Sequence, residues 1–224
     1  FSPDTPLISS GEETDRVLPV VTGLLAERDT IVAVDTWRAE VGAACVTAGA
    51  AVLNDTSGLA DPDMARLAAD TGAQLVICHS LAEPHTHLRR PHYDDVVDEV
   101  RAFLTDRVEL ALSLGVGEEQ IIVDPGPDLN KTTRHTLELF RRFAEITALG
   151  FPTLVAVSNK DVIGETLDRP RGERLPGSIA AATWCLAAGG SILRVHDVVA
   201  GVDTVRMAAG IRGWREPAYQ RHNV

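Results

Sequence analysis

The chain has 224 residues, of which 45% are hydrophobic and 24% charged, and its formal net charge is −11. A chain of this length and composition can bury one sizeable core, and we expect residues 1–224 to form a single domain. So acidic a protein lacks the clustered Lys and Arg that nucleic-acid phosphates require, which argues against a nucleic-acid partner. No apolar run reaches the roughly 18 residues of a membrane span, so we expect no membrane partner either.

Short apolar runs typical of strands recur along the chain, at 31–35, 51–54, 74–78, 121–124, 153–157 and 192–195. Residues with helical periodicity fill the intervals between them. Glycines that can end a helix follow the helical segments, at Gly49, Gly72, Gly115 and Gly150. Six strands that alternate with helices predict a parallel sheet, and their continuous apolar character predicts that both faces are covered.

Three cysteines, Cys45, Cys78 and Cys185, fall inside these predicted elements and show no CxxC spacing. An odd number of scattered cysteines is typical of a reduced protein without a disulfide framework. We therefore predict a cytoplasmic location and structural roles for the three thiols.

Two architectures fit this alternation: a doubly wound open sheet, and a TIM (β/α)₈ barrel whose first two strands are missing from this chain. Each predicted strand ends in polar residues, which in chain order include Asp35, Asn54, His79, Asp124, Ser158 and Arg194. An open sheet gathers its ligands near one switch point, whereas all strand ends of a barrel converge on one mouth. Polar residues at all six ends favour the barrel, with the six C-terminal βα units present.

Three of the polar residues that end predicted strands could also have purely structural roles, as a helix cap or as turn residues. Asp35 directly precedes a helical segment and could cap it. Asn54 opens the run Asn-Asp-Thr-Ser-Gly, which could be only a turn. Asp124 also precedes turn residues, but Lys131 follows it closely. A carboxylate at a strand end with a lysine nearby predicts a paired site, although loop salt bridges are common.

Arg194 and His196 end the last predicted strand two residues apart. Because side chains at i and i+2 share one face of a strand, both are predicted to point into the barrel mouth as an anion clamp. The alternative is a surface ion pair with the neighbouring Asp197.

Four histidines follow the third predicted strand, at His79, His85, His87 and His92. Their spacing matches neither HExxH nor a Cys/His zinc set, so we predict a solvated loop and no metal site. The mouth then holds carboxylates, an amide, lysines and an anion clamp. This inventory predicts a transferase for a heteroaromatic substrate with a phosphate-type leaving group.

Four segments carry a resemblance to a known family: VDTWRAEVGAACVTAGAAVLNDTSG (34–58), IIVDPGPDLNKTTRHTLELF, LVAVSNKDVIGETL and ILRVHDV. In this order they resemble the motifs of dihydropteroate synthases, the pterin-binding (β/α)₈ barrels of folate biosynthesis. The resemblance implies a reaction in which p-aminobenzoate displaces pyrophosphate from a dihydropterin pyrophosphate, usually with Mg²⁺.

The resemblance also assigns roles at the mouth. Asp35, Asn54, Asp124 and Lys160 would hold the pterin, with Lys131 counted among the substrate-binding residues. Arg194 and His196 would hold the pyrophosphate, and Ser158 would lie by the aminobenzoate. Lys160, Asp124 and Arg194 are the expected catalytic residues. The family also implies a homodimer through the last helices, for which an apolar stripe is available at Val202, Val205, Met207 and Ile211; a stripe facing the barrel's own core is the alternative.

The chain departs from the family pattern at three positions: Asp128 stands for a glycine, Leu129 for a phenylalanine and Asn159 for an arginine. Its first loop, residues 1–6, also lacks the family's arginine, and the family's usual metal-contacting segment is absent from this chain. With these departures the chain resembles the divergent second copy of actinobacterial type found beside an orthodox synthase. Two functions follow, a synthase and a paralogue that binds pterin or pterin phosphate without synthase activity. A methyltetrahydrofolate-binding domain of corrinoid methyltransferases is a third, since it shares the barrel and the Asp and Asn set.

Overall fold

The computed structural model describes residues 7–82, 86, 88 and 90–222. Helices and parallel strands alternate along the chain. The elements are α1 (Ser10–Glu27), β1 (Ala33–Asp35), α2 (Ala39–Thr47), β2 (Val52–Asp55), α3 (Asp63–Thr71), β3 (Gln74–Cys78), α4 (Val96–Ser113), the 3₁₀ helix η1 (Glu118–Gln120), β4 (Ile121–Asp124), α5 (Thr133–Arg141), α6 (Phe143–Thr147), β5 (Leu154–Val155), α7 (Asp161–Leu167), α8 (Leu175–Ala187), β6 (Ile192–Leu193) and α9 (Val198–Ile211).

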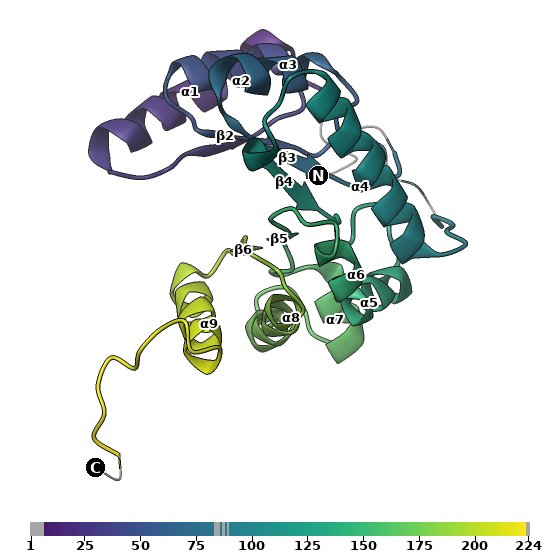
Figure 1. Cartoon of the computed structure of the whole chain (residues 1–224), viewed down its shortest axis with the longest axis vertical. Coiled ribbons are helices and arrows are strands. Elements are labelled where there is room, and N and C mark those ends of the chain that lie inside the picture. Colours follow the sequence, from purple (N-terminus) through teal and green to yellow (C-terminus); the bar gives the residue numbers. More distant parts are fainter. Residues whose placement is uncertain (1–6, 83–85, 87, 89, 223–224) are drawn as a thin grey trace.

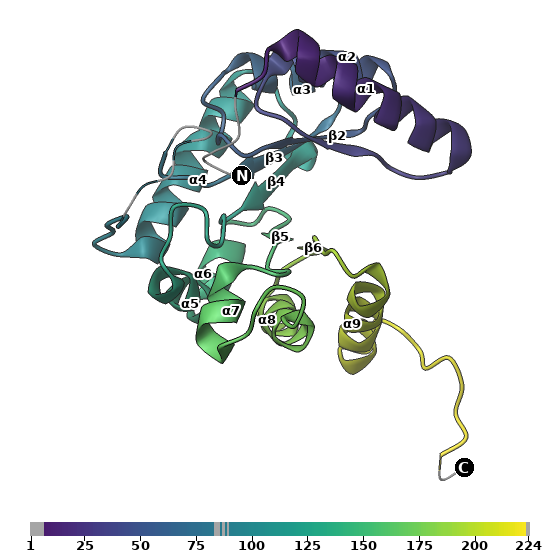
Figure 2. The ribbon, with the colours of Figure 1, turned by 180° about the vertical axis from the view of Figure 1, so that it is seen from behind.

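The strands are parallel and lie side by side in chain order. β1 to β4 form one sheet, β5 pairs with β6, and a parallel bridge between Val123 and Thr153 connects the two groups. Figures 1 and 2 show the strands inside an arc of helices. Sequential parallel strands with helices outside them are the arrangement of consecutive units in a (β/α)₈ barrel. The barrel prediction and its six βα units are therefore confirmed.

Side chains on each strand alternate between the helix-covered face and the inner face of the arc. Leu53, Leu75 and Ile121 belong to the large core under the helices, which also contains Met64 and Leu104. A smaller cluster on the inner face combines residues from neighbouring strands: Val52, Val76, Ile122, Leu154, Ala156 and Ile192. This alternation decides which polar residues at the strand ends reach the barrel interior.

The register of the strands aligns the predicted site residues. Asp35 is the neighbour of Asn54, and Asn54 is in turn the neighbour of Val76. Asp124 lies beside Cys78, two residues further along β3. Asp35, Asn54 and Asp124 therefore share the inner face, with Asp124 one layer closer to the mouth.

The predicted glycines follow the ends of helices, and all four have positive φ: Gly49, Gly72, Gly115 and Gly150. The three cysteines are buried free thiols, in agreement with their predicted structural roles. Across the described ranges, no helix is both long and apolar enough to cross a membrane.

The apolar stripe of α9 lies on the surface. Val202, Val205, Met207 and Ile211 are 40%, 44%, 65% and 73% exposed. In this chain the stripe is thus not packed against the core formed by the described residues.

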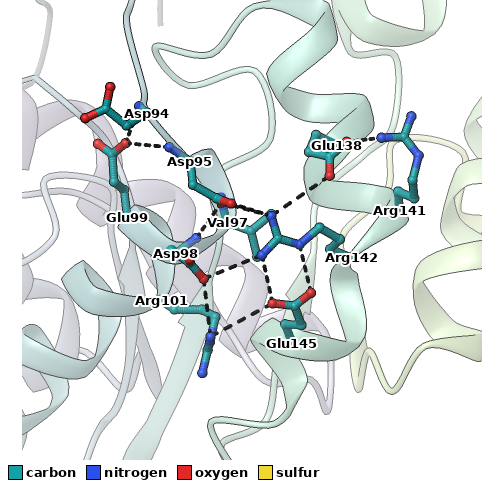
Figure 3. A network of polar contacts seen from close by, with 10 residues as sticks. All are labelled: Asp94, Asp95, Val97, Asp98, Glu99, Arg101, Glu138, Arg141, Arg142 and Glu145. Carbon is teal, nitrogen blue, oxygen red and sulfur yellow. Dashed lines mark hydrogen bonds and ion pairs between the residues drawn. The ribbon is translucent and has the colours of Figure 1, made fainter.

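A polar network joins α4 to α5 and α6 (Figure 3). Arg142 donates to Asp95 Oδ2 at 2.7 Å and to Glu145 Oε1 at 2.8 Å. Asp95 also caps α4 by accepting from the backbone N–H groups of Val97 and Asp98. Arg142 lowers the pKa of Glu145, and the backbone N–H of Asp98, followed by the same arginine, lowers the pKa of Asp95. This network is structural, because all of its members come from the helical layer.

Candidate functional site

Asp35 and Asn54 form a polar edge on neighbouring strands. Asn54 Nδ2 donates to Asp35 Oδ2 at 3.1 Å, and Arg194 Nη2 lies 3.7 Å from the same oxygen. Arg194 comes from the end of β6, so the contact joins opposite ends of the strand series. α2 begins without a side-chain cap at its N-terminus, so Asp35 does not serve as its cap. These contacts support the prediction that Asp35 faces the barrel interior.

The electrostatic surroundings of Asp35 are mixed. Desolvation by the surrounding protein raises the pKa of Asp35, although 47% of its side chain is exposed. Arg194 and the hydrogen bond from Asn54 act in the opposite direction. The carboxylate thus keeps an exposed acceptor side in a partly desolvated position, where a ligand hydrogen bond is stronger than in water.

The turn after β2 is made by Asp55. Asp55 Oδ1 accepts from the Ser57 backbone N–H at 2.8 Å, and Oδ2 accepts from the Leu59 N–H at 2.9 Å. Asn54 is consequently not needed for the turn. Within the described part of the chain, no group hydrogen-bonds to Asn54 Oδ1, although this atom is buried. A buried unpaired acceptor on the inner face indicates a ligand-binding position.

Asp124 lies at the end of β4 and is 5% exposed. Its Oδ1 accepts from the Gly126 backbone N–H at 2.8 Å. Burial raises the pKa of Asp124, while the Gly126 hydrogen bond and then the positive charges of Lys160 and Lys131 oppose this increase. One oxygen of the Asp124 carboxylate therefore stabilises the turn after β4, and the residue lies at the mouth end of the strand.

Gly126 brings the loop after β4 against the end of β3. Its φ is +61°, and a Cβ at this position would lie 2.1 Å from the backbone oxygen of His79. Only glycine fits both the left-handed conformation and this close approach. A glycine is thus required at position 126 by the geometry of the mouth.

Lys131 is buried and holds the same loop. Its Nζ lies 2.8 Å from His79 Nδ1 and donates to the carbonyl oxygens of Gly126 at 3.0 Å and Leu129 at 3.3 Å. An ammonium has three N–H groups, so these three partners occupy all of them. Burial lowers the pKa of Lys131 to about 7. Direct substrate binding by Lys131 stays a prediction; its contacts give it a role in holding the loop.

His79 is the partner of this lysine and is 2% exposed. Its ring packs edge-on against Phe103, with ring centroids 4.9 Å apart. Burial, followed by the charge of Lys131, lowers the pKa of His79 to about 2. The imidazole is therefore neutral at physiological pH, with the lone pair of Nδ1 accepting from Lys131.

Lys160 extends from the turn before α7 to the loop after β4. Its Nζ donates to the backbone oxygen of Pro127 at 2.9 Å, across 33 positions of sequence. The positive charge of this lysine also acts on Asp124, whose pKa it lowers against the effect of burial. This contact places the Lys160 ammonium beside the loop that follows Asp124, and its binding of substrate stays a prediction.

Ser158 and His196 lie together at the ends of β5 and β6. His196 Nδ1 is 3.0 Å from Ser158 Oγ, and the His196 backbone N–H donates to the same oxygen at 3.3 Å. Asp197 accepts from the Ala200 N–H and caps α9. Arg194 makes its ion pair with Asp35 instead, so the predicted alternative of an Arg194–Asp197 pair is not what is observed.

A hollow of about 310 Å³ opens on the inner face and is lined by Asn54, Val76, Ile122, Leu154 and Arg194 among others. This volume lies at the lower end of the range for small-molecule sites. Most of its lining is apolar; Asn54 and Arg194 lie at its mouth end, and Gln74 lies at the opposite end. The arrangement suits a flat heterocycle that presents hydrogen-bonding groups along one edge.

The histidines do not form a metal site among the described residues. His79 is buried beside Lys131, His92 is exposed beside Asp94, and His85 and His87 lie outside the described residues. In residues 7–82, 86, 88 and 90–222, no group of three or more His, Cys, Asp or Glu side chains could hold a metal ion.

Arg174 and Ser178 were not anticipated from the sequence. Arg174 Nη1 donates to the backbone oxygens of Asn159 and Lys160, and Ser178 Oγ accepts from the Asn159 N–H. Asn159 has φ +59°, in the left-handed region that asparagine tolerates better than most residues. Only the proximity of helix α8 to this turn reveals these contacts, and no local sequence signal does.

Comparisons with known proteins agree with this geometry. The family model described as "Pterin binding enzyme" matches residues 2–196. "Inactive dihydropteroate synthase 2" of Mycobacterium tuberculosis (strain ATCC 25618 / H37Rv) is 42% identical over 211 residues, which are 92% of this chain and 66% of that protein. Dihydropteroate synthase of Escherichia coli (strain K12) is 34% identical, over 92% of this chain and 73% of that protein.

A solved structure of the same family is also similar to this chain. Dihydropteroate synthase from Thermus thermophilus in complex with 4-aminobenzoate superimposes with a TM-score of 0.87 and 38% identity, over 94% of this chain and 80% of that one. The chain thus spans about two thirds of the length of its mycobacterial relatives and more of the solved synthase. On the strength of the shared barrel, the strand-end residues and these matches, the chain belongs to the pterin-binding enzyme family.

Proposed function

We propose that the protein binds dihydropterin pyrophosphate at the mouth of the barrel and condenses it with p-aminobenzoate, as a dihydropteroate synthase. The observation that carries this proposal is the convergence of Asp35, Asn54, Asp124, Lys160 and Arg194 at the carboxyl ends of the parallel strands. Relatives with the names of synthases, and a solved synthase that holds 4-aminobenzoate, support it.

The pterin is recognised along its polar edge. Asp35 and Asp124 accept hydrogen bonds from its amino and ring N–H groups, and the unpaired Oδ1 of Asn54 offers a further acceptor. The Lys160 ammonium, now on the Pro127 oxygen, donates to the pterin carbonyl. The ring lies against the mostly apolar lining of the hollow, which excludes water from one face.

The reaction is a displacement at the methylene carbon of the pterin. The aminobenzoate nitrogen forms a bond to this carbon, the bond to the pyrophosphate oxygen breaks, and the amine releases one proton to solvent. Arg194 and His196 stabilise the negative charge that develops on the leaving pyrophosphate. The remaining residues align the amine with the carbon, which removes much of the entropic cost of the encounter.

The resemblance also implies Mg²⁺, which in this family would assist the departure of the pyrophosphate. The described residues offer no cluster of ligands that fits it. We therefore assign no step to the metal.

A second function is a paralogue that binds pterin or pterin phosphate without synthase activity. Asn159 stands where the family has an arginine, and the 42% identical mycobacterial relatives are called inactive. Loss of a planar cation weakens the grip on an anionic second substrate while leaving the pterin side intact.

Calorimetry and a product assay distinguish the two functions. Dihydropterin pyrophosphate is titrated into the protein with and without p-aminobenzoate, and dihydropteroate is measured by chromatography. Turnover that is abolished in Asp35→Asn supports the synthase, and pterin binding without turnover supports the paralogue. No pterin binding contradicts both.

We further propose that residues 1–224 act as one cytoplasmic pterin-binding domain in a homodimer. The buried free cysteines fit a reducing compartment. The exposed apolar stripe of α9 supports the dimer, because a second subunit packed on it would remove it from water. Light scattering of the protein and of Met207→Lys tests the dimer, which the lysine is expected to dissociate.

A further inference from the structure

Arg174 is a buried arginine that lies outside the predicted site. It is 8% exposed and sits immediately before α8. Its Nη1 donates to Asp161 Oδ1 at 2.7 Å, to Asn159 O at 3.0 Å and to Lys160 O at 3.2 Å. Its Nε donates to Arg169 O at 3.1 Å. A buried cation whose donors are directed mainly at backbone oxygens fixes the path of the chain that carries them.

The surrounding residues fix the same turn from other sides. Ser178 Oγ accepts from the Asn159 N–H at 3.1 Å and donates to the Arg174 oxygen at 2.8 Å. Asp128 Oδ2 accepts from the Val162 N–H at 3.0 Å. Gly164 leaves room for the guanidinium, since a Cβ there would lie 2.3 Å from Arg174 Nη2. Residues 159–162 are thus held by groups from α8 and from the loop after β4.

This turn carries the lysine of the proposed pterin site. Lys160 enters the site through a stem of limited length, so the position of its backbone decides which atoms its ammonium can reach. Nζ reaches the Pro127 oxygen at 2.9 Å, beside the loop of Asp124. A shift of the backbone by about 1 Å is enough to misplace such a group for binding.

We propose that Arg174 is a positioning residue that acts through Lys160: by fixing the backbone oxygens of Asn159 and Lys160, it directs the Lys160 ammonium into the pterin site. This inference rests on the proposed pterin-binding function. Asp128, which replaces a family glycine, supports the same turn from the opposite side through the Val162 N–H.

A lysine cannot replace this arginine. The planar guanidinium presents several donors in fixed directions, whereas an ammonium at the end of a flexible stem has a single centre. Removing the guanidinium leaves the oxygens of Asn159 and Lys160 without their buried partner, which loosens the turn. The side chain of Asp161 is 60% exposed, so water can solvate its carboxylate when the guanidinium is removed.

A double-mutant cycle tests the inference. The Kd for dihydropterin pyrophosphate is measured by calorimetry for the wild type, Lys160→Ala, Arg174→Lys and the double variant. Arg174→Lys is expected to weaken binding about tenfold in the wild type and less than about twofold in the Lys160→Ala background. An equal effect in both backgrounds overturns the inference, because Arg174 would then act independently of Lys160.

Two further measurements separate positioning from stability. Amide hydrogen exchange at residues 159–162 is expected to accelerate in Arg174→Lys, and unchanged exchange overturns the inference.

Arg142→Ala is the matched control, since it removes an arginine that binds carboxylates of the helical layer (Figure 3). It is expected to lower the Tm and leave the pterin Kd unchanged. If the wild type binds no pterin, the proposed function fails as well; if it binds and the cycle shows no coupling, only the role of Arg174 fails.

Discussion

The neutral His79 predicts a specific dependence of stability on acid. The ring is buried and accepts from Lys131, and its pKa of about 2 lies below the unfolded value of 6.5. As the pH falls, the unfolded state binds this proton first. The contribution of His79 to the free energy of unfolding is therefore fully present above pH 6.5 and is lost as the pH falls below it. The loss approaches about 1.4 kcal/mol per pH unit, so this group costs about 2 kcal/mol between about pH 7.5 and pH 5.

The variant His79→Asn isolates this contribution. Its Oδ1 replaces Nδ1 as the acceptor for Lys131, but the amide cannot titrate. Urea unfolding of both proteins at a series of pH values across this interval gives the difference in their free energies of unfolding. We expect the wild type to lose about 2 kcal/mol relative to the variant over this interval.

The exposed His92 supplies the control for this experiment. Its side chain is 86% exposed, so His92→Asn controls for replacing a histidine by asparagine at a position outside the buried pair. Equal pH slopes for the wild type and His79→Asn would refute the reasoning, because His79 would then titrate alike in the folded and unfolded states.

Three further experiments test single steps. Gly126→Ala is expected to destabilise the protein by more than about 2 kcal/mol, because its Cβ would meet the His79 oxygen at 2.1 Å; Gly72→Ala, with φ +76° and no atom within 4 Å, should cost only about 1–2 kcal/mol, and equal Tm losses would contradict the contact. Asn159→Arg is expected to raise the affinity for p-aminobenzoate and, at φ +59°, to lower the free energy of unfolding by about 1 kcal/mol. Calorimetry and urea unfolding measure both, and unchanged affinity would show that this position is not limiting. Asp95→Ala, which removes the cap of α4 and a partner of Arg142, is expected to lower the Tm without changing pterin affinity; a changed affinity would contradict its structural role.

The strand positions could be predicted because their signals are local. An apolar run and a polar end suffice to place Asp35, Asn54 and Asp124, and the two-residue period of a strand places Arg194 on the inner face. Only the structure could decide which of Asn54 and Asp55 makes the turn after β2. Both residue types form turns, and the register decides that Asp55 makes this one.

Long-range pairing could not be predicted in the same way. His79 and Lys131 lie 52 positions apart and meet because Gly126 lets the loop after β4 approach β3. Arg174 contacts the turn of Lys160 only because α7 and α8 fold back on each other. Such pairs depend on loop paths, and no periodicity in the sequence encodes them. The metal and dimer expectations came from the resemblance alone.

The most direct test of the account is the binding of dihydropterin pyrophosphate to the inner face. Titration calorimetry of the wild type is predicted to show saturable binding at one site per chain, weakened about tenfold or more in Asn54→Leu. Gln74→Leu, on the same face at the opposite end of the strands, is predicted to bind like the wild type. Absence of binding, or equal binding by all three proteins, would contradict a pterin site at the carboxyl ends of the strands.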